Sequence, residues 1–178
     1  MIQTDGALDP FTILGLEDSM EVDPADLKKR LRRFTRLVHP DFYALEGTEN
    51  LALAEENNAL LNEAYDILSD DIRRADWLVR HLGGPSEKDL GGMPQEFLME
   101  VMEWNEVLEE AEAGSQALRT LEDELCAHRD RVTREIRTSL TPLPEHGAPA
   151  LESTRKNINA YRYIDRAMQR IAGIPYTL

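Results

Sequence analysis

The chain has very little cysteine and histidine, and this scarcity excludes several kinds of site. Among its 178 residues there is one cysteine, Cys126, and no Cys-x-x-Cys pair, so neither an internal disulfide nor a thiolate cluster for zinc or iron–sulfur is expected. The four histidines include no pair at the spacing that puts two imidazoles on one helical face. A glycine-rich phosphate loop and a Gly-x-Ser-x-Gly elbow are also missing. We therefore expect no metal, no cofactor and no catalytic chemistry.

Long apolar runs are missing as well. No stretch approaches the roughly 20 apolar residues that a membrane span needs, and the opening "MIQTDGALDP" lacks the features of a signal peptide. We expect an intracellular, cytoplasmic protein. The net charge of -14 argues against nucleic acid as a partner, because phosphate binding depends on Lys and Arg.

Charge is unevenly distributed along the chain. Residues 28–36 carry six basic side chains and no acidic one, whereas residues 96–124 carry ten acidic side chains against Arg119 alone. Two surfaces of opposite sign are therefore expected.

The apolar residues recur with a helical period and strand patterns are scarce, so we expect an all-α protein. A short helix should follow Asp9-Pro10 and close at Gly15. A longer one should start at Asp23-Pro24 and stop by Val38 or His39, since a proline comes next. Its apolar stripe is Leu27, Leu31, Phe34 and Val38. Two more helices are expected, one at about 51–68 with Leu61, Ala64 and Leu68 on one stripe, and one closed by Gly83-Gly84.

Residues 83–94, "GGPSEKDLGGMP", combine glycine, proline and charge without apolar period, which indicates a linker. Three amphipathic stretches follow at about 95–113, 115–139 and 150–172. Short connections between them predict an antiparallel three-helix bundle. The predicted core of the second is Leu118, Leu121, Leu125, His128, Val132 and Ile136, and that of the third is Leu151, Ile158, Tyr161, Met168 and Ile171.

Four motifs occur in order over about residues 9–82: "DPFTILGL", the basic helix, "HPD" and "NEAYDILSDDIRRADWL". In content and order they resemble the J-domain of DnaJ-type co-chaperones. The tripeptide alone is a weak signal, and the order of the four motifs carries the resemblance. It implies an N-terminal J-domain, residues 1–82, built on a helical hairpin. Phe42 follows the tripeptide where many J-domains have lysine.

The second half looks like the C-terminal domain of the HscB family, the J-proteins of iron–sulfur cluster biogenesis. The segment "EFLMEVMEWNEVLEEAE" follows the linker, whereas an ordinary DnaJ would continue with a Gly/Phe-rich segment and cysteine-rich zinc repeats. The N-terminal cysteine pairs of eukaryotic relatives are absent, which favours the bacterial type. The resemblance implies a C-terminal bundle, residues 95–178, in an L-shaped arrangement with the J-domain.

The same resemblance implies that the J-domain binds a DnaK-type chaperone ATPase, in this family HscA, and stimulates its ATP hydrolysis. The implied chaperone-binding residues are His39, Pro40, Asp41, Lys28, Lys29, Arg30, Arg32, Arg33 and Arg36. Asp41 would accept hydrogen bonds from a partner arginine, and the basic residues would steer association. Taken alone, the tripeptide would be a helix stop followed by a turn, and the basic run a solvated helix face.

The first bundle helix carries more apolar surface than one core needs. Its core stripe is Phe97, Val101, Trp104, Leu108 and Ala111, which leaves Leu98 and Met102 at the flank and Met99 on the far side with glutamates. The resemblance implies that this surface binds IscU, the scaffold for cluster assembly, through Leu98, Met99, Met102, Glu103, Glu106, Glu110 and Tyr163. In the alternative interpretation, Leu98, Met99 and Met102 are core residues.

Together these expectations describe a co-chaperone that binds the scaffold through its bundle, delivers it to the chaperone and assists cluster transfer. One alternative is a J-protein that serves a general DnaK-type chaperone with another client. Another is a helical interaction protein in which the tripeptide is incidental. An ATPase assay separates this last alternative from the other two.

Overall fold

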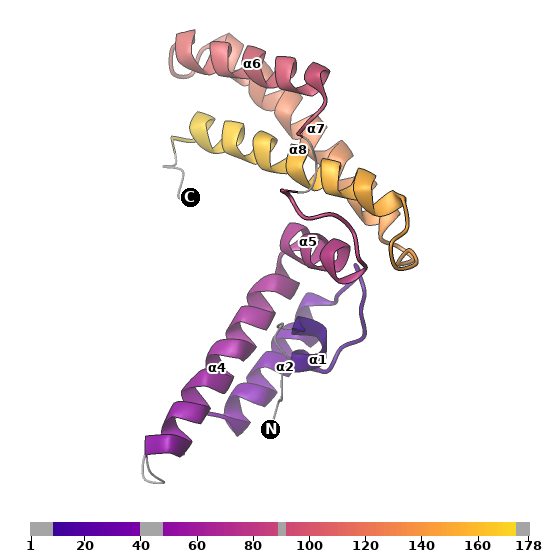
Figure 1. Ribbon diagram of the computed structural model, residues 1–178. Helices are drawn as coiled ribbons and strands as arrows, with labels where there is room; N and C mark the ends of the chain where they lie inside the picture. Colours follow the sequence, from indigo (N-terminus) through magenta and orange to yellow (C-terminus); the bar gives the residue numbers. More distant parts are fainter. Residues whose placement is uncertain (1–8, 40–47, 89–91, 174–178) are drawn as a thin grey trace. The chain divides into compact units, whose positions relative to one another are not determined.

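The computed structural model describes residues 9–39, 48–88 and 92–173, and this part of the chain is helical without a strand (Figure 1). The chain divides into two compact units, Met1–Leu78 and Val79–Leu178. The all-α expectation is confirmed. The helices are α1 (Pro10–Leu14), α2 (Pro24–Leu37), α4 (Thr48–Ser69), α5 (Asp71–His81), α6 (Gln95–Glu110), α7 (Gln116–Ser139) and α8 (Ala150–Ile171).

The first unit is built around α4, which packs against both α1 and α2 (Figure 1). Asp9 caps α1 by accepting hydrogen bonds from the backbone N–H groups of Phe11 and Thr12. Gly15 closes the same helix in the left-handed conformation, with φ of 65°. The core is apolar, and its fully buried side chains include Phe11, Leu14, Leu27, Leu61, Leu68 and Leu78.

Helix α2 begins and ends where the sequence predicts. Asp23 accepts a hydrogen bond from the N–H of Ala25, and Pro24 occupies the first turn. The helix ends at Leu37, two residues before His39. Leu27 is buried, whereas the other members of its apolar stripe, Leu31, Phe34 and Val38, are half-buried.

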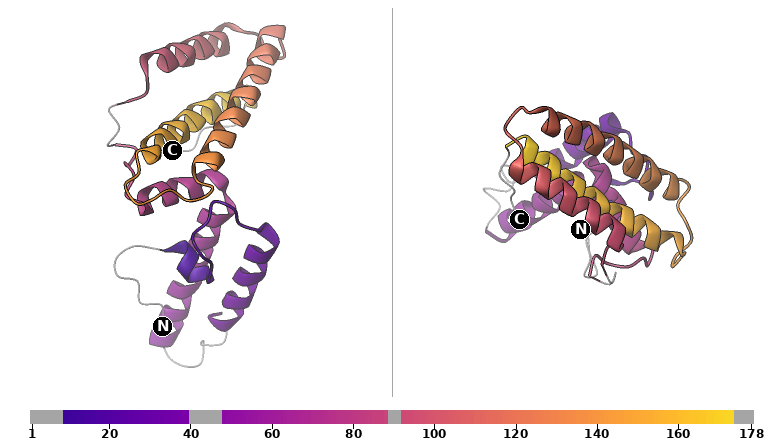
Figure 2. Two further views of the ribbon diagram at one scale, coloured as in Figure 1. Left: turned by 90° about the vertical axis from the view of Figure 1, so that its right-hand side faces the viewer. Right: turned by 90° about the horizontal axis from the view of Figure 1, so that it is seen from above.

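In the second unit, α7 and α8 run side by side and form the main packing interface (Figure 2). On α7 four of the six positions of the predicted stripe are buried: Leu121, Leu125, Val132 and Ile136. Leu118 and His128 are half-buried.

The predicted stripe of α8 is wrong in its second half. Leu151 and Ile158 are buried, but Tyr161, Met168 and Ile171 are only half-buried. The buried positions toward the end of the helix are Ile164 and Ala167. At about 100° per residue, Ala167 lies on the opposite side of the helix from Ile158, so the buried side of α8 changes along its length and Tyr161 and Met168 are not central to it.

The start of the predicted linker is tied to the second unit. The N–H of Gly147 donates to the carbonyl oxygen of Leu82 at 2.7 Å, and Arg155 Nε donates to the carbonyl oxygen of Pro85 at 2.8 Å. A Cβ atom on Gly84 would lie 2.7 Å from the carbonyl oxygen of Val79 and 2.9 Å from Leu151 Cβ, so only glycine fits there.

Candidate partner-binding surfaces

The basic side chains of α2 lie on the outside of the first unit. Five of them are exposed, Lys28, Lys29, Arg32, Arg33 and Arg36, and we call this set the basic face. The single acidic residue of the helix, Asp26, is in its first turn. Most of the length of α2 therefore presents positive charge to solvent.

Arg30 differs from its basic neighbours because it is used within the first unit. Its Nε lies 2.6 Å from Asp26 Oδ2, and its Nη1 donates to the carbonyl oxygens of Leu14 and Gly15. These carbonyls end α1 and lack helical partners of their own. Arg30 thus holds α1 against α2, a role that the sequence analysis did not assign to it.

The "HPD" tripeptide is only partly within the described residues. His39 follows Val38, the C-cap of α2, and is half-buried. Pro40 and Asp41 lie outside the described residues. The role of the tripeptide in chaperone binding therefore stays a prediction.

Helix α6 has no buried residue, and one of its sides is apolar and exposed. The exposed fractions are 39% for Leu98, 56% for Met99 and 71% for Met102. Glu103, Glu106 and Glu110 are exposed beside them. We call these six residues the α6 face. The alternative that the three apolar side chains belong to the bundle core does not hold.

A cluster of rings attaches α6 to the other two helices of the bundle. Phe97 makes edge contacts with Trp104, His128 and Tyr163, with ring centroids 5.8, 6.1 and 5.8 Å away. Trp104 also meets His128 edge-on at 5.8 Å. Edge-to-face ring pairs stabilise a fold beyond the apolar area that they bury. The ring cluster therefore helps to hold α6 on the bundle, although this helix has no buried residue.

His128 on α7 is the titratable member of this ring cluster. Burial lowers the pKa of His128 from its ordinary value of 6.5, and the charge of Arg131 lowers it further. Glu100 and Glu135 oppose this effect, and Glu100 Oε2 lies 4.0 Å from the imidazole Nδ1. The neutral ring is therefore the favoured form within the bundle.

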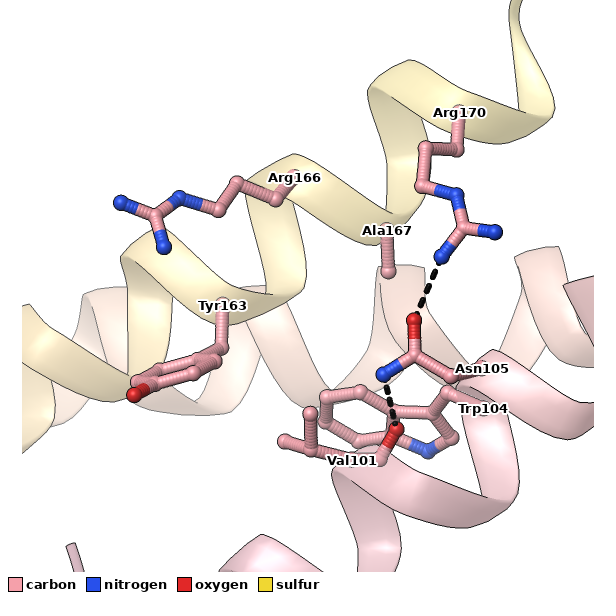
Figure 3. A pocket seen from close by; sticks show the side chains of 7 residues that line it. All are labelled: Val101, Trp104, Asn105, Tyr163, Arg166, Ala167 and Arg170. Atoms are coloured by element: carbon pink, nitrogen blue, oxygen red, sulfur yellow. Dashed lines mark hydrogen bonds between the residues drawn. The ribbon is translucent and has the colours of Figure 1, made fainter. Parts of the chain in front are cut away.

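Tyr163 lies in a groove between α6 and α8 rather than on the α6 face (Figure 3). The groove has a volume of about 370 Å³ and is lined by Val101, Trp104, Asn105, Tyr163, Arg166, Ala167 and Arg170. Arg170 Nη1 donates a hydrogen bond to Asn105 Oδ1. The amide nitrogen of the same side chain, Asn105 Nδ2, donates to the carbonyl oxygen of Val101 at 2.8 Å. The Arg166 guanidinium lies 5.8 Å from the Tyr163 ring centroid.

The sequence analysis missed the arginines of this groove. A usable signal was present, because Arg162, Arg166 and Arg170 recur every four residues and so share one side of a helix. In a chain of net charge -14, three cations on one side of a helix indicate a candidate binding surface.

Within residues 9–39, 48–88 and 92–173, no three His, Cys, Asp or Glu side chains are grouped so that they could hold a metal ion. None of the helices in the described part of the chain has the length and apolar character needed to cross a membrane.

Two protein families match the chain, one for each half. The family described as "DnaJ domain" matches residues 9–77, and the family described as "HSCB C-terminal oligomerisation domain" matches residues 93–172. Their order along the chain is the order expected from the sequence.

Two proteins with similar sequences are both named HscB. The chain is 31% identical over 130 residues to "Co-chaperone protein HscB homolog" of Pseudoalteromonas atlantica, which covers 71% of this chain and 74% of that one. It is 32% identical over 134 residues to the human "Iron-sulfur cluster co-chaperone protein HscB", covering 74% of this chain and 56% of that one.

Solved structures agree with these sequence matches. The crystal structure of human co-chaperone HscB superposes with a TM-score of 0.80 at 27% identity, covering 95% of this chain and 83% of that one. HscB from Vibrio cholerae has the same fold, with a TM-score of 0.75 at 22% identity and coverages of 93% and 96%. The chain belongs to the HscB family of J-domain co-chaperones.

Proposed function

We propose that this co-chaperone is a two-site adaptor for iron–sulfur cluster transfer. Its bundle, residues 95–178, binds an IscU-type scaffold protein, and its J-domain, residues 1–82, binds an HscA-type chaperone of the DnaK class and stimulates its ATPase. Residues 83–94 link the two domains. The protein acts in the cytoplasm, has no catalytic chemistry of its own and requires no cofactor.

The observation that carries this proposal is the exposed α6 face. Methionine adapts its shape to a partner surface, and Met99 and Met102 are 56% and 71% exposed. Glu103, Glu106 and Glu110 surround them with negative charge. A scaffold with an apolar patch bordered by basic residues would complement this face.

The basic face of α2 supports the chaperone half of the proposal. Exposed cations accelerate association with an acidic surface, so they would bring the tripeptide to the chaperone quickly. Once both partners are bound, the scaffold is held at high effective concentration next to the chaperone. Hydrolysis would then lock the chaperone onto a scaffold that is already in place.

A steady-state ATPase assay with an HscA-type chaperone and an IscU-type scaffold tests the proposal. The wild-type chain should stimulate hydrolysis, and the scaffold should increase the effect. His39→Gln should abolish stimulation while scaffold binding remains, since the two sites are separate. His81→Gln is the matched control, because it makes the same substitution at another histidine near a helix end.

The assay also separates the alternatives. Stimulation of a general DnaK-type chaperone and not of the HscA type would favour a J-protein with another client. If His39→Gln stimulates as well as the wild type, the tripeptide is not the chaperone-binding element and the proposal fails.

A further inference from the structure

The groove between α6 and α8 has the chemistry of a peptide site. Its floor is apolar and aromatic, formed by Val101, Trp104 and Ala167, and Tyr163 closes one end (Figure 3). Its volume of about 370 Å³ is near the lower end of ordinary ligand pockets, which run from roughly 300 to 1,000 Å³. This space suits one bulky side chain with a short piece of extended backbone.

The rim of the groove is positively charged. Arg166 and Arg170 border it from α8, four residues apart, and none of the described residues that line it is acidic. A guanidinium beside an apolar floor binds a carboxylate well, because the fork of N–H groups matches the two oxygens and the nearby surface excludes water. The groove therefore fits a segment that carries Asp or Glu next to a bulky apolar residue.

The groove and the α6 face adjoin each other on α6. At about 100° per residue, Leu98 and Met102 follow Asn105 around the helix, and Asn105 lines the groove. A partner seated on the α6 face would reach the groove without a gap. The two surfaces have opposite charge, since glutamates border the α6 face and arginines border the groove.

We infer that an extended segment of the scaffold, with a carboxylate beside a bulky apolar side chain, occupies this groove when the scaffold is bound. Arg166 and Arg170 hold the carboxylate, and Trp104, Val101 and Ala167 receive the apolar side chain. The inference rests on the proposed scaffold-binding function. Because glutamates border the α6 face and arginines of α8 border the groove, a scaffold turned end for end would meet like charges, so the groove fixes its orientation.

Calorimetric titration of the full chain with an apo IscU-type scaffold tests the inference. Arg166→Glu should weaken binding by about tenfold or more, because it places a like charge against the carboxylate. Arg134→Glu is the matched control: it makes the same charge change at an exposed position of α7 away from the groove, and should change the affinity by less than about twofold.

A second variant tests the shape of the groove without changing charge. Ala167 is 7% exposed and its Cβ points into the groove, so Ala167→Met places a flexible side chain where the segment would lie (Figure 3). It should weaken scaffold binding by about tenfold, with a thermal melt confirming the fold. If this variant does not fold, Arg166→Glu decides alone, since Arg166 is exposed.

Wild-type affinity in Arg166→Glu overturns the inference. If Met102→Ala still weakens binding in the same series, the α6 face stands and only the groove is unused. If the wild-type chain does not bind the scaffold, the proposed function fails and the inference fails with it.

Discussion

At the level of single residues, Met99 and Met102 distinguish a binding surface from a core. They are 56% and 71% exposed, so truncating them removes little packing. We predict that Met99→Ala and Met102→Ala each weaken scaffold binding by about 1 to 2 kcal/mol, as interface anchors do, and leave the free energy of unfolding almost unchanged. Calorimetric binding beside urea unfolding measures both quantities.

Leu125→Ala on α7 is the contrasting control, because Leu125 is fully buried. It should lower the free energy of unfolding by about 2 to 5 kcal/mol, with normal affinity for the protein that remains folded. If Met99→Ala behaves like Leu125→Ala, the scaffold-binding surface has to be sought elsewhere.

Arg155 is the largest fully buried side chain, and its Nε donates to the carbonyl oxygen of Pro85 at 2.8 Å. We predict that Arg155→Met lowers the free energy of unfolding by about 2 to 4 kcal/mol, because it leaves the carbonyl of Pro85 without this donor and changes the packing at a fully buried position. Lys156→Met is the neighbouring control. It removes a surface pair with Glu152 and should cost less than about 1 kcal/mol. If both variants lost the same free energy of unfolding, the buried hydrogen bond of Arg155 would not be what stabilises the fold.

The sequence could have revealed Arg155 only by its position. It falls between Leu151 and Ile158 at spacings of four and three, which places it on the core stripe of α8. A charge at such a position is normally interpreted as solvent-exposed, and an acceptor for its guanidinium, the carbonyl oxygen of Pro85, is 70 residues away. A non-local partner of this kind cannot be inferred from local spacing.

At the level of elements, α6 is the least anchored helix of the bundle. It has no buried residue and no side-chain cap at its N-terminus, whereas α7 is capped by Ser115 and buries four residues. We predict that the amides of α6 exchange with solvent faster than those at the centres of α7 and α8. Hydrogen exchange by mass spectrometry or NMR measures this. Scaffold binding should slow the exchange of α6, and equal protection of all three helices in the free protein would contradict the prediction.

His128 is expected to make the stability of the bundle depend on pH. Its pKa in the folded protein is below the ordinary value of 6.5, so the unfolded chain takes up a proton first as the pH falls. The stability that the neutral ring contributes is therefore present above about pH 6.5 and is lost as the pH falls through the lower folded pKa. We predict that this loss is smaller in His128→Gln than in the wild type.

Urea unfolding at about pH 7.5 and about pH 5.5 measures this difference. His81→Gln, at an exposed histidine, should keep the wild-type response. An unchanged response in His128→Gln would show that carboxylates, and not this ring, carry the pH dependence.

Helix ends were predictable because local chemistry sets them. Asp9, Asp23 and Ser115 accept hydrogen bonds from the first turns of their helices, and Gly15 adopts the left-handed conformation at a helix end. The buried side of α8 was harder to predict. Tyr161 and Met168 are apolar enough for a core, and only the contacts with α7 and α6 decide that Ile164 and Ala167 occupy it instead.

At the level of the whole molecule, charge separates the two proposed functions. The basic face belongs to the first unit, and the glutamates of the α6 face belong to the second. The sequence predicted this separation because charge runs are local. It did not predict the arginine-rimmed groove, which forms only when α6 and α8 pack together. The expected L-shaped arrangement stays a prediction.

This separation predicts different salt dependences for the two partners. Exposed charges interact through solvent, and salt screens them over about 10 Å at roughly 0.1 M. Association with the chaperone depends on the basic face, so its rate should fall steeply as salt rises from about 50 to about 500 mM. Scaffold binding combines apolar contact with charges of both signs and should change less.

Charge reversal at the basic face tests whether these residues cause the salt dependence of chaperone association. Arg32→Glu, Arg33→Glu and Arg36→Glu should each lower the association rate and flatten its salt dependence, with a smaller effect on dissociation, because long-range steering acts before contact. Arg134→Glu, with the same change in net charge on the other unit, should leave the rate close to the wild-type value. Stopped-flow or biosensor kinetics across the salt series measure both rates. An association rate that is indifferent to salt would mean that the chaperone approaches another surface of the first unit, since no interaction with the basic face could escape screening.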